Sequence, residues 1–174
     1  LPAAIAAPTP ISALVHSSTL VTAGVYLLFR SYFLFSQNFL FGISLFGILT
    51  ASIAFSSALF ELDVKKIVAL STLSHIGVIV VILNFPFIIF SHLIIHAYFK
   101  ALLFIVIGIA IHFYQRAQDA SYYGPLNLKD PLALSIFIIR VISMCGAPFI
   151  SGYFRKDCIL ETAFILGSML SKIF

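Results

Sequence analysis

The sequence predicts an all-α fold, a polytopic transmembrane helix bundle of about five spans, and three observations support this prediction. Of the 174 residues, 61% are hydrophobic and only 9% are charged, whereas soluble domains carry about 25% charged residues. The hydrophobic residues gather in blocks that reach the ~20 residues needed to cross a bilayer. Short polar stretches separate the blocks. Residues 1–174 are therefore predicted to form one transmembrane domain.

The first hydrophobic block runs from about Thr9 to Phe35 and the second from about Phe39 to Phe60. Pro10 stands at the start of the first block, where proline is favoured because the first helical turn makes no use of its missing N–H. A polar Ser-Gln-Asn run at 36–38 separates the two blocks. Each block is long enough for one transmembrane helix.

The third block runs from Val64 to Asn84 and the fourth from Pro86 to about Tyr114. Charged residues cluster at the start of the third block: Glu61, Asp63, Lys65 and Lys66. An acid at position 63 can cap the helix and complements its positive N-terminal end. Lys66 is predicted to anchor the helix at the membrane interface. The fourth block is longer than a single span requires, which allows a tilt or a local break.

The fifth block begins at Pro131 and continues past Leu170, which is too long for one straight span. It follows the polar stretch 115–130, which is predicted to be an extramembrane loop. Pro148 falls inside the block, and proline both removes a backbone donor and clashes with the preceding turn. We therefore predict that this helix is broken near Gly146–Gly152, with two separate passes as the alternative.

Composition and charge exclude several classes of protein. The net charge of +4 is thinly spread, with Lys65–Lys66 as its densest basic pair, so no nucleic-acid partner is predicted. Cys145 and Cys158 have neither CxxC nor metal-ligand spacing, so we predict no disulfide framework and no metal site. The chain opens with Leu1 and lacks the basic start of a signal peptide, so we expect it to be a piece of a larger chain.

Three ionisable residues in the fourth block, His92, His96 and Lys100, follow one another at intervals of four. At this spacing a helix drifts by about 40° per step, so the three lie on one face, about 6 Å apart along the axis. A charge in the middle of a membrane costs roughly 2.5–3.5 kcal/mol, which favours a functional role. Histidine exchanges protons near neutral pH, and water can bridge each gap. A proton relay is predicted, with inter-helix hydrogen bonding and metal binding as alternatives.

Further candidates lie outside the fourth block. Lys156 and Asp157 follow the predicted helix break, and a break inside a membrane is tolerated where it lines a cavity; a lysine that snorkels to the interface is the alternative. Lys65 precedes a polar stripe within the third block, and the stripe could line water. His16 begins another polar patch, His-Ser-Ser-Thr, in the first block. The residues of the polar stripe are Ser71, Thr72, Ser74 and His75.

Four segments resemble, in order, motifs of the NADH–ubiquinone oxidoreductase chain 5 family. They are LPAAIAAPTPISALVHSST at 1–19, DVKKIVALST at 63–72, HLIIHAYFKALLF at 92–104 and PFISGYFRKDCILE at 148–161. The resemblance implies an antiporter-like subunit in the membrane arm of respiratory complex I, in the mitochondrial inner membrane. Members of the family pump protons with energy from quinone reduction elsewhere in the complex.

The resemblance also implies partners, cofactors and site residues. The partners would be the other membrane-arm subunits, the lipid bilayer, protons and internal water. NADH, FMN, the Fe–S clusters and ubiquinone would bind in other subunits, so this chain would bind no cofactor and hold no redox site. By motif, three residues would form the central relay and four would extend it: His92, His96 and Lys100, then Lys65, Lys156 with its partner Asp157, and the channel-lining His16.

The chain departs from the family pattern in several places. His75 stands where many members have Gln, and Arg155 replaces the Ser before Lys-Asp. The family's earlier helices and its long lateral C-terminal helix are missing, so the chain would be part of a pump. Two other functions stay open. An Mrp-type Na⁺/H⁺ antiporter shares the third motif but typically has Lys where Thr22 stands, and a structural scaffold would use the polar residues only for inter-helix bonds.

Overall fold

The computed structural model describes residues 19–83, 85–113, 118–123 and 131–149, together with 152–153, 157–159, 161–162 and 164. These residues form long α-helices and two short 3₁₀ helices, with no β-strand beyond one isolated bridge. The predicted all-α fold is therefore confirmed. The helices are α2 (Leu20–Ser31), α3 (Gln37–Phe60), α4 (Val64–Val81), α5 (Pro86–Phe113) and α7 (Pro131–Cys145), with η3 (Tyr32–Leu34) and η4 (Ala120–Tyr123).

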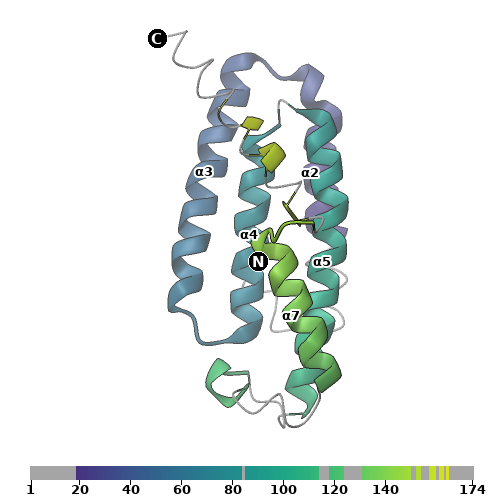
Figure 1. The fold of residues 1–174 in the computed structure, drawn as a ribbon. Helices are drawn as coiled ribbons and strands as arrows, with labels where there is room; N and C mark the ends of the chain where they lie inside the picture. Colours follow the sequence, from purple (N-terminus) through teal and green to yellow (C-terminus); the bar gives the residue numbers. More distant parts are fainter. Residues whose placement is uncertain are drawn as a thin grey trace.

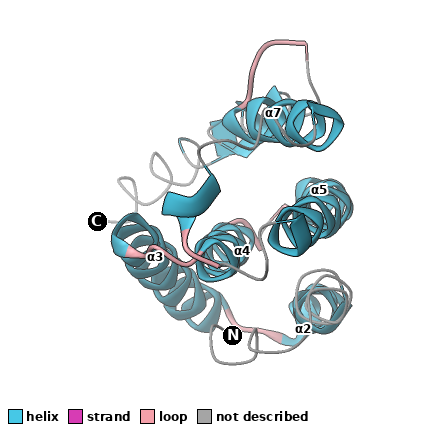
Figure 2. Ribbon diagram, turned by 90° about the horizontal axis from the view of Figure 1, so that it is seen from below, coloured by secondary structure: helices cyan, strands magenta, loops and turns pink. Residues whose placement is uncertain are grey.

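The long helices run side by side as a bundle (Figure 1). Seen along their axes, α4 lies near the middle, with α3 and α5 on either side of it (Figure 2). Helix α4 contacts α3, α5 and α2, and α5 contacts α4, α7 and α2. The α4–α5 pair is therefore the centre of the bundle, and side chains between these two helices are shielded from the surroundings.

Three of the described helices are long and apolar enough to cross a membrane: α3, α4 and residues 87–113 of α5. Their bounds agree with the predicted second, third and fourth blocks to within three residues. Helix α2 with η3, and part of α7, are shorter apolar helices. The predicted start of the first block at Thr9 lies outside the described residues. The chain is a multi-pass membrane protein.

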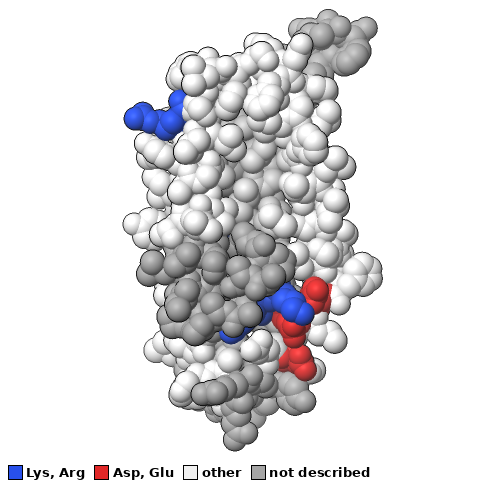
Figure 3. Space-filling view, turned by 180° about the vertical axis from the view of Figure 1, so that it is seen from behind, with Lys and Arg blue, Asp and Glu red and all other residues white. Residues whose placement is uncertain are grey.

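Charge is confined to the ends of the bundle on the face drawn in Figure 3. Charged side chains gather towards the upper and lower ends, and the described surface between them carries none. Large hydrophobic side chains are exposed along the same helices, among them Phe46 and Leu59 on α3 and Phe90 on α5. An uncharged band between charged ends suits a hydrocarbon layer bounded by water.

Helices α3 and α4 approach each other closely at two glycines. A Cβ atom on Gly47 would lie 2.8 Å from the carbonyl oxygen of Gly77, and one on Gly77 would lie 2.7 Å from that of Gly47. Both positions therefore need glycine if the backbones are to stay in contact. Small residues allow such close packing between transmembrane helices.

The segment after α5 is fastened to the start of α4 by backbone hydrogen bonds. The Val64 N–H donates to the Gln118 carbonyl oxygen at 3.0 Å, and the Ala120 N–H donates to that of Leu62 at 2.9 Å. These bonds form the isolated bridge between Asp63 and Asp119. The chain entering α4 is thereby held in place by a segment more than fifty residues later in the sequence.

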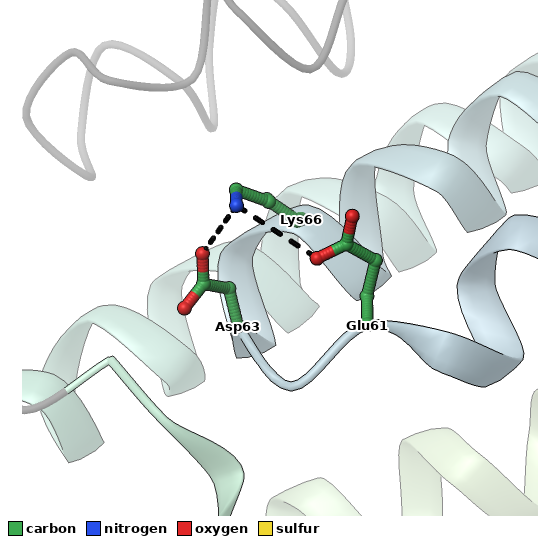
Figure 4. Close-up of polar contacts among 3 residues, drawn as sticks. All are labelled: Glu61, Asp63 and Lys66. Carbon is green, nitrogen blue, oxygen red and sulfur yellow. Dashed lines mark ion pairs between the residues drawn. The ribbon is translucent and has the colours of Figure 1, made fainter.

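Charged residues at the same end form a small ion-pair network (Figure 4). Asp63 is the N-cap residue of α4, as predicted, but its carboxylate makes no capping hydrogen bond. It instead lies 2.7 Å from the Lys66 ammonium, which is also 3.7 Å from the Glu61 carboxylate. The hydrogen bond from Lys66 lowers the pKa of Asp63 below its usual value. Lys66 is half-exposed, in keeping with the predicted interfacial position.

The predicted interruption after Pro131 is confirmed in its described part. Helix α7 ends at Cys145, and Gly146 follows with a φ of 83°. Phe149 has a φ of 68°, which is unusual for a bulky residue. Helical structure is present again at Gly152, whose Cα packs directly against the Ser143 carbonyl oxygen with no room for a side chain. Helix α7 and the helical residues 152–153 are therefore separate segments that approach each other closely at Ser143 and Gly152.

Candidate functional site

The three ionisable side chains of α5 are buried inside the bundle. His92, His96 and Lys100 are 1%, 3% and 0% exposed. Because they are four residues apart, they share one face of α5. That face is directed towards α4, because Lys100 and His96 contact Ser71 and His75 of that helix. The three groups therefore lie away from the lipid-facing surface, as a relay requires, although their role in proton transfer stays a prediction.

A third histidine, His75 of α4, joins the two on α5. Its ring centroid lies 6.0 Å from that of His92 and 5.5 Å from that of His96, and the His92 and His96 rings are 6.2 Å apart and nearly parallel. These distances place the three imidazoles next to one another inside the bundle. We call His75, His92 and His96 the imidazole cluster.

Lys100 is linked to α4 through Ser71. The Lys100 ammonium donates a hydrogen bond of 2.6 Å to the Ser71 hydroxyl oxygen. The Ser71 hydroxyl in turn donates to the Val68 carbonyl oxygen at 2.7 Å. The Ser71 hydroxyl therefore holds the Lys100 ammonium against α4.

The two helices present matching rows of polar residues. Ser71 and His75 are four residues apart on α4, as are His96 and Lys100 on α5. The Ser71–Lys100 and His75–His96 contacts show that the two rows run in opposite directions. One continuous polar row thus passes from Lys100 through the imidazole cluster, and it alternates between the two helices.

Lys65 lies apart from this row. It is buried, with 9% of its surface exposed, at the start of α4. Six residues of helix, about 9 Å, separate it from Ser71. Val68 lies within this interval, and it packs in an apolar cluster with Leu103 and Phe104. An apolar layer therefore stands between Lys65 and Lys100, and the expected connection between them would need water or movement within that layer.

The other predicted site residues belong to two different parts of the sequence. Lys156 and Asp157 follow the helix break, and His16 precedes α2. Asp157 is half-buried in a short helical piece. Lys156 and His16 lie outside the described residues. The structure therefore brings together His92, His96 and Lys100 and places Lys65 apart from them, while Lys156 and His16 stay predictions.

Sequence reasoning placed Ser71 and His75 in a polar stripe and gave neither a specific role. The signal that could have found them is their spacing of four on α4, which repeats the spacing on α5. Thr72, in the same stripe, is fully buried and donates to the Ala69 carbonyl oxygen at 2.6 Å. Among the described residues, no group of three or more His, Cys, Asp or Glu is arranged to hold a metal ion.

A groove of about 620 Å³ lies between α3 and α4. Most of its wall is apolar, and its polar wall residues are Ser52 from α3 and Ser74 and His75 from α4. His75 therefore borders both the groove and the imidazole cluster. The other lining residues are Ile48, Ala51, Phe55, Val78, Val81, Ile82 and Ile159.

Comparison with known proteins gives one consistent result. Residues 1–174 match the family described as NADH:quinone oxidoreductase/Mrp antiporter, transmembrane. NADH-ubiquinone oxidoreductase chain 5 of Aedes aegypti is 50% identical over 169 residues, which are 95% of this chain and 29% of that protein. The proteins of the same name from Locusta migratoria and Mytilus edulis are 48% and 45% identical over 92% and 97% of this chain.

A solved structure has the same fold. A chain of the membrane-bound sulfane sulfur reductase, an archaeal respiratory membrane complex, superimposes with a TM-score of 0.85 and 26% sequence identity. The match covers 93% of this chain and 35% of that one. The present chain spans less than a third of the length of the chain 5 proteins named above.

Proposed function

The chain belongs to the NADH:quinone oxidoreductase/Mrp antiporter transmembrane family, and on that premise we propose that it is the proton-conducting part of a complex I membrane-arm subunit. In this proposal it resembles its relatives named NADH-ubiquinone oxidoreductase chain 5 in function as well as in sequence. The subunit would lie in the mitochondrial inner membrane beside other membrane-arm subunits.

One observation carries the proposal, namely the buried polar row between α4 and α5. A charged or titratable group within a membrane is costly unless other protein groups surround it. Here Lys100 and two histidines are almost wholly buried, and Ser71 and His75 from the neighbouring helix lie against them. A scaffold would need only one such polar contact to join two helices. The length of the row favours conduction.

The residues of the row suit transfer of a proton without net chemical change. The Lys100 ammonium can release a proton to a bridging water, and the neutral amine that remains can accept another. A neutral imidazole that takes up a proton on one ring nitrogen can release one from the other. The Ser71 hydroxyl keeps the lysine nitrogen in position during both states. One proton enters the row and one leaves it.

The energy for pumping would come from outside this chain. Moving one charge against 100 mV costs ~2.3 kcal/mol, and the row itself contains no source of that energy. The proposal therefore places electron transfer from NADH to ubiquinone, with FMN and the Fe–S clusters, in other subunits. This chain would contribute to an NADH:ubiquinone reductase without binding a cofactor of its own.

Replacement of Lys100 tests this function. In inner-membrane vesicles that contain the assembled complex, Lys100→Ala should reduce NADH-driven proton uptake to near background, because the row loses its titratable end. Lys66→Ala is the matched control, since Lys66 is a half-exposed lysine at the membrane edge, and it should pump normally. Full pumping by Lys100→Ala, with normal amounts of the complex, would refute the proposal.

An Mrp-type Na⁺/H⁺ antiporter is the second candidate, because the matching family includes Mrp antiporters by description. The two functions differ in their dependence on sodium. Proton movement that requires a sodium gradient in reconstituted vesicles, and that continues without NADH, would favour the antiporter. Proton movement that requires NADH and is indifferent to sodium would favour the complex I subunit.

A further inference from the structure

His75 lies at the boundary between two environments. On one side its ring packs against the buried rings of His92 and His96, at centroid distances of 6.0 and 5.5 Å. On the other side it lines the groove between α3 and α4, together with Ser52 and Ser74. Among the described residues that line this groove, His75 is the one whose ring also lies against those of His92 and His96.

We propose that His75 is a third proton-carrying imidazole of this site, and that it connects His92 and His96 to water in the groove between α3 and α4. The inference rests on the proposed function, proton conduction, and adds a lateral branch to the row. The class of ligand in the groove is water or hydronium, which Ser52 and Ser74 can bind by hydrogen bonds.

The geometry favours a branch over a simple hydrogen-bonding role. His75 is half-buried, whereas His92 and His96 are almost completely inaccessible. His75 therefore offers the α5 pair a more accessible neighbour through which a proton can enter or leave, and its ring lies next to both of theirs. Relatives with Gln at this position would lack the branch.

The proton balance of the branch is simple. A hydronium in the groove gives one proton to a ring nitrogen of His75, and water remains in the groove. The opposite ring nitrogen releases a proton through a bridging water to His96 or His92, which becomes an imidazolium. His75 is neutral again at the end, so no oxidant, reductant or further reactant is needed.

Among the described residues, His92 and His96 from α5 are titratable groups whose rings lie against that of His75. The α3 residues on the opposite wall of the groove are Ile48, Ala51, Ser52 and Phe55, and none of them titrates near neutral pH. A change in the pH profile after substitution of His75 would therefore report on the imidazole cluster.

Two substitutions separate proton transfer from packing. The glutamine of His75→Gln has a hydrogen-bond donor and an acceptor but does not titrate. The phenylalanine of His75→Phe has an aromatic ring but neither donor nor acceptor. NADH oxidation and proton uptake are measured together in vesicles containing the assembled complex. We expect both variants to lose several-fold in protons moved per NADH oxidised and to alter the pH profile of pumping, because neither introduced side chain exchanges protons near neutral pH.

Lys100→Ala in the same assay separates this inference from the proposed function. If Lys100→Ala abolishes pumping but His75→Gln pumps with the parental yield and pH profile, His75 is not a proton carrier and the proposed function stands. If Lys100→Ala also pumps normally, the proposed function itself fails. Loss in His75→Phe with rescue by His75→Gln would assign His75 a packing or hydrogen-bonding role and would overturn the inference.

A cysteine placed in the groove tests the water that the branch requires. Ser52→Cys and Ser56→Cys, made in a background without Cys145 and Cys158, are treated with a charged, water-soluble thiol reagent. Both serines are exposed on α3 and donate to the carbonyl three residues earlier, but only Ser52 lines the groove. We expect Ser52→Cys to react and Ser56→Cys, one turn further along α3 and outside the groove lining, to remain unmodified.

The modified protein then gives a second measurement of the branch. The adduct on Ser52→Cys should slow pumping, because it displaces water beside His75, and it should have no further effect in combination with His75→Gln. No reaction at Ser52→Cys, or a reaction without effect on pumping, would overturn the link between His75 and the groove. The reaction of Ser52→Cys and its effect on pumping in the parental background do not depend on whether the His75 variants assemble.

Discussion

Helices α3 and α5 are both long, apolar and able to cross a membrane, yet they have opposite relations to the rest of the bundle. Only 11% of the apolar stretch of α3 is buried, against 44% of that in α5. Helix α3 contains no ionisable residue between Gln37 and Phe60. Helix α5 has the higher hydropathy of the two although it carries His92, His96 and Lys100. Apolar character therefore does not distinguish the outer helix from the central one, but the location of ionisable groups does.

The physical reason is that the surroundings of a transmembrane helix are apolar on every side. A leucine side chain is about as stable against lipid as against another helix, because both are apolar. Its presence therefore does not indicate which of the two it contacts. A lysine or histidine is tolerated only where protein groups or water meet it. The three ionisable residues of α5 thus identify the face of the helix that the bundle has to cover.

The largest difference in stability between variants of the two helices is expected when an aromatic side chain is truncated. Phe104→Ala on α5 removes a ring that is 1% exposed, and we expect a loss of about 3–5 kcal/mol in stability because of the cavity that remains. Phe55→Ala on α3 removes a ring that is 65% exposed, and the change should stay within about 0.5 kcal/mol. Thermal unfolding of the solubilised complex measures both. Similar losses would contradict the distinction between central and outer helices.

A smaller effect is expected at the one edge where α3 is closely packed. Gly47→Val should destabilise the α3–α4 pair by about 1–3 kcal/mol, because its side chain would meet the Gly77 backbone. Gly42→Val, on the same helix, meets nothing within 4 Å and should be tolerated. The yield of assembled complex at increasing temperature compares the two variants. Equal sensitivity at both glycines would show that α3 and α4 are not held by close backbone contact.

The smallest effect concerns the charged end of the bundle, where solvent screens the charges. Lys66 lowers the pKa of Asp63 from its ordinary value of 3.8, so the folded chain favours the carboxylate. The resulting stabilisation is fully present above that value and fades as the pH falls below it. We expect a slight loss of thermal stability on acidification through this range, reduced in Asp63→Asn. An unchanged acid response in Asp63→Asn would exclude the contribution of this ion pair.

Much of this architecture could be predicted from local patterns. Block lengths predicted α3, α4 and α5, and Pro148 with its neighbouring glycines predicted the interruption after α7. The spacing of His92, His96 and Lys100 predicted a single helix face. These features depend only on residues close together in the sequence.

The contacts between helices could not be predicted in the same way. Apolar periodicity gives little indication of how α4 and α5 align in a membrane, so the meeting of His75 with His96, and of Ser71 with Lys100, was not foreseen. The apolar layer between Lys65 and Lys100 likewise depends on which residues of α5 lie opposite Val68. Such information comes from tertiary alignment, which single-sequence patterns do not contain.

The bridge between residues 62–64 and 118–120 limits how this molecule can move. A piston-like slide of α4 by one helical turn, about 5.4 Å, would break both backbone hydrogen bonds. Rocking about the fastened end would leave them intact and would displace the far end of the helices most. Any cycle of opening and closing around the histidines is therefore expected to resemble a hinge anchored at one membrane surface.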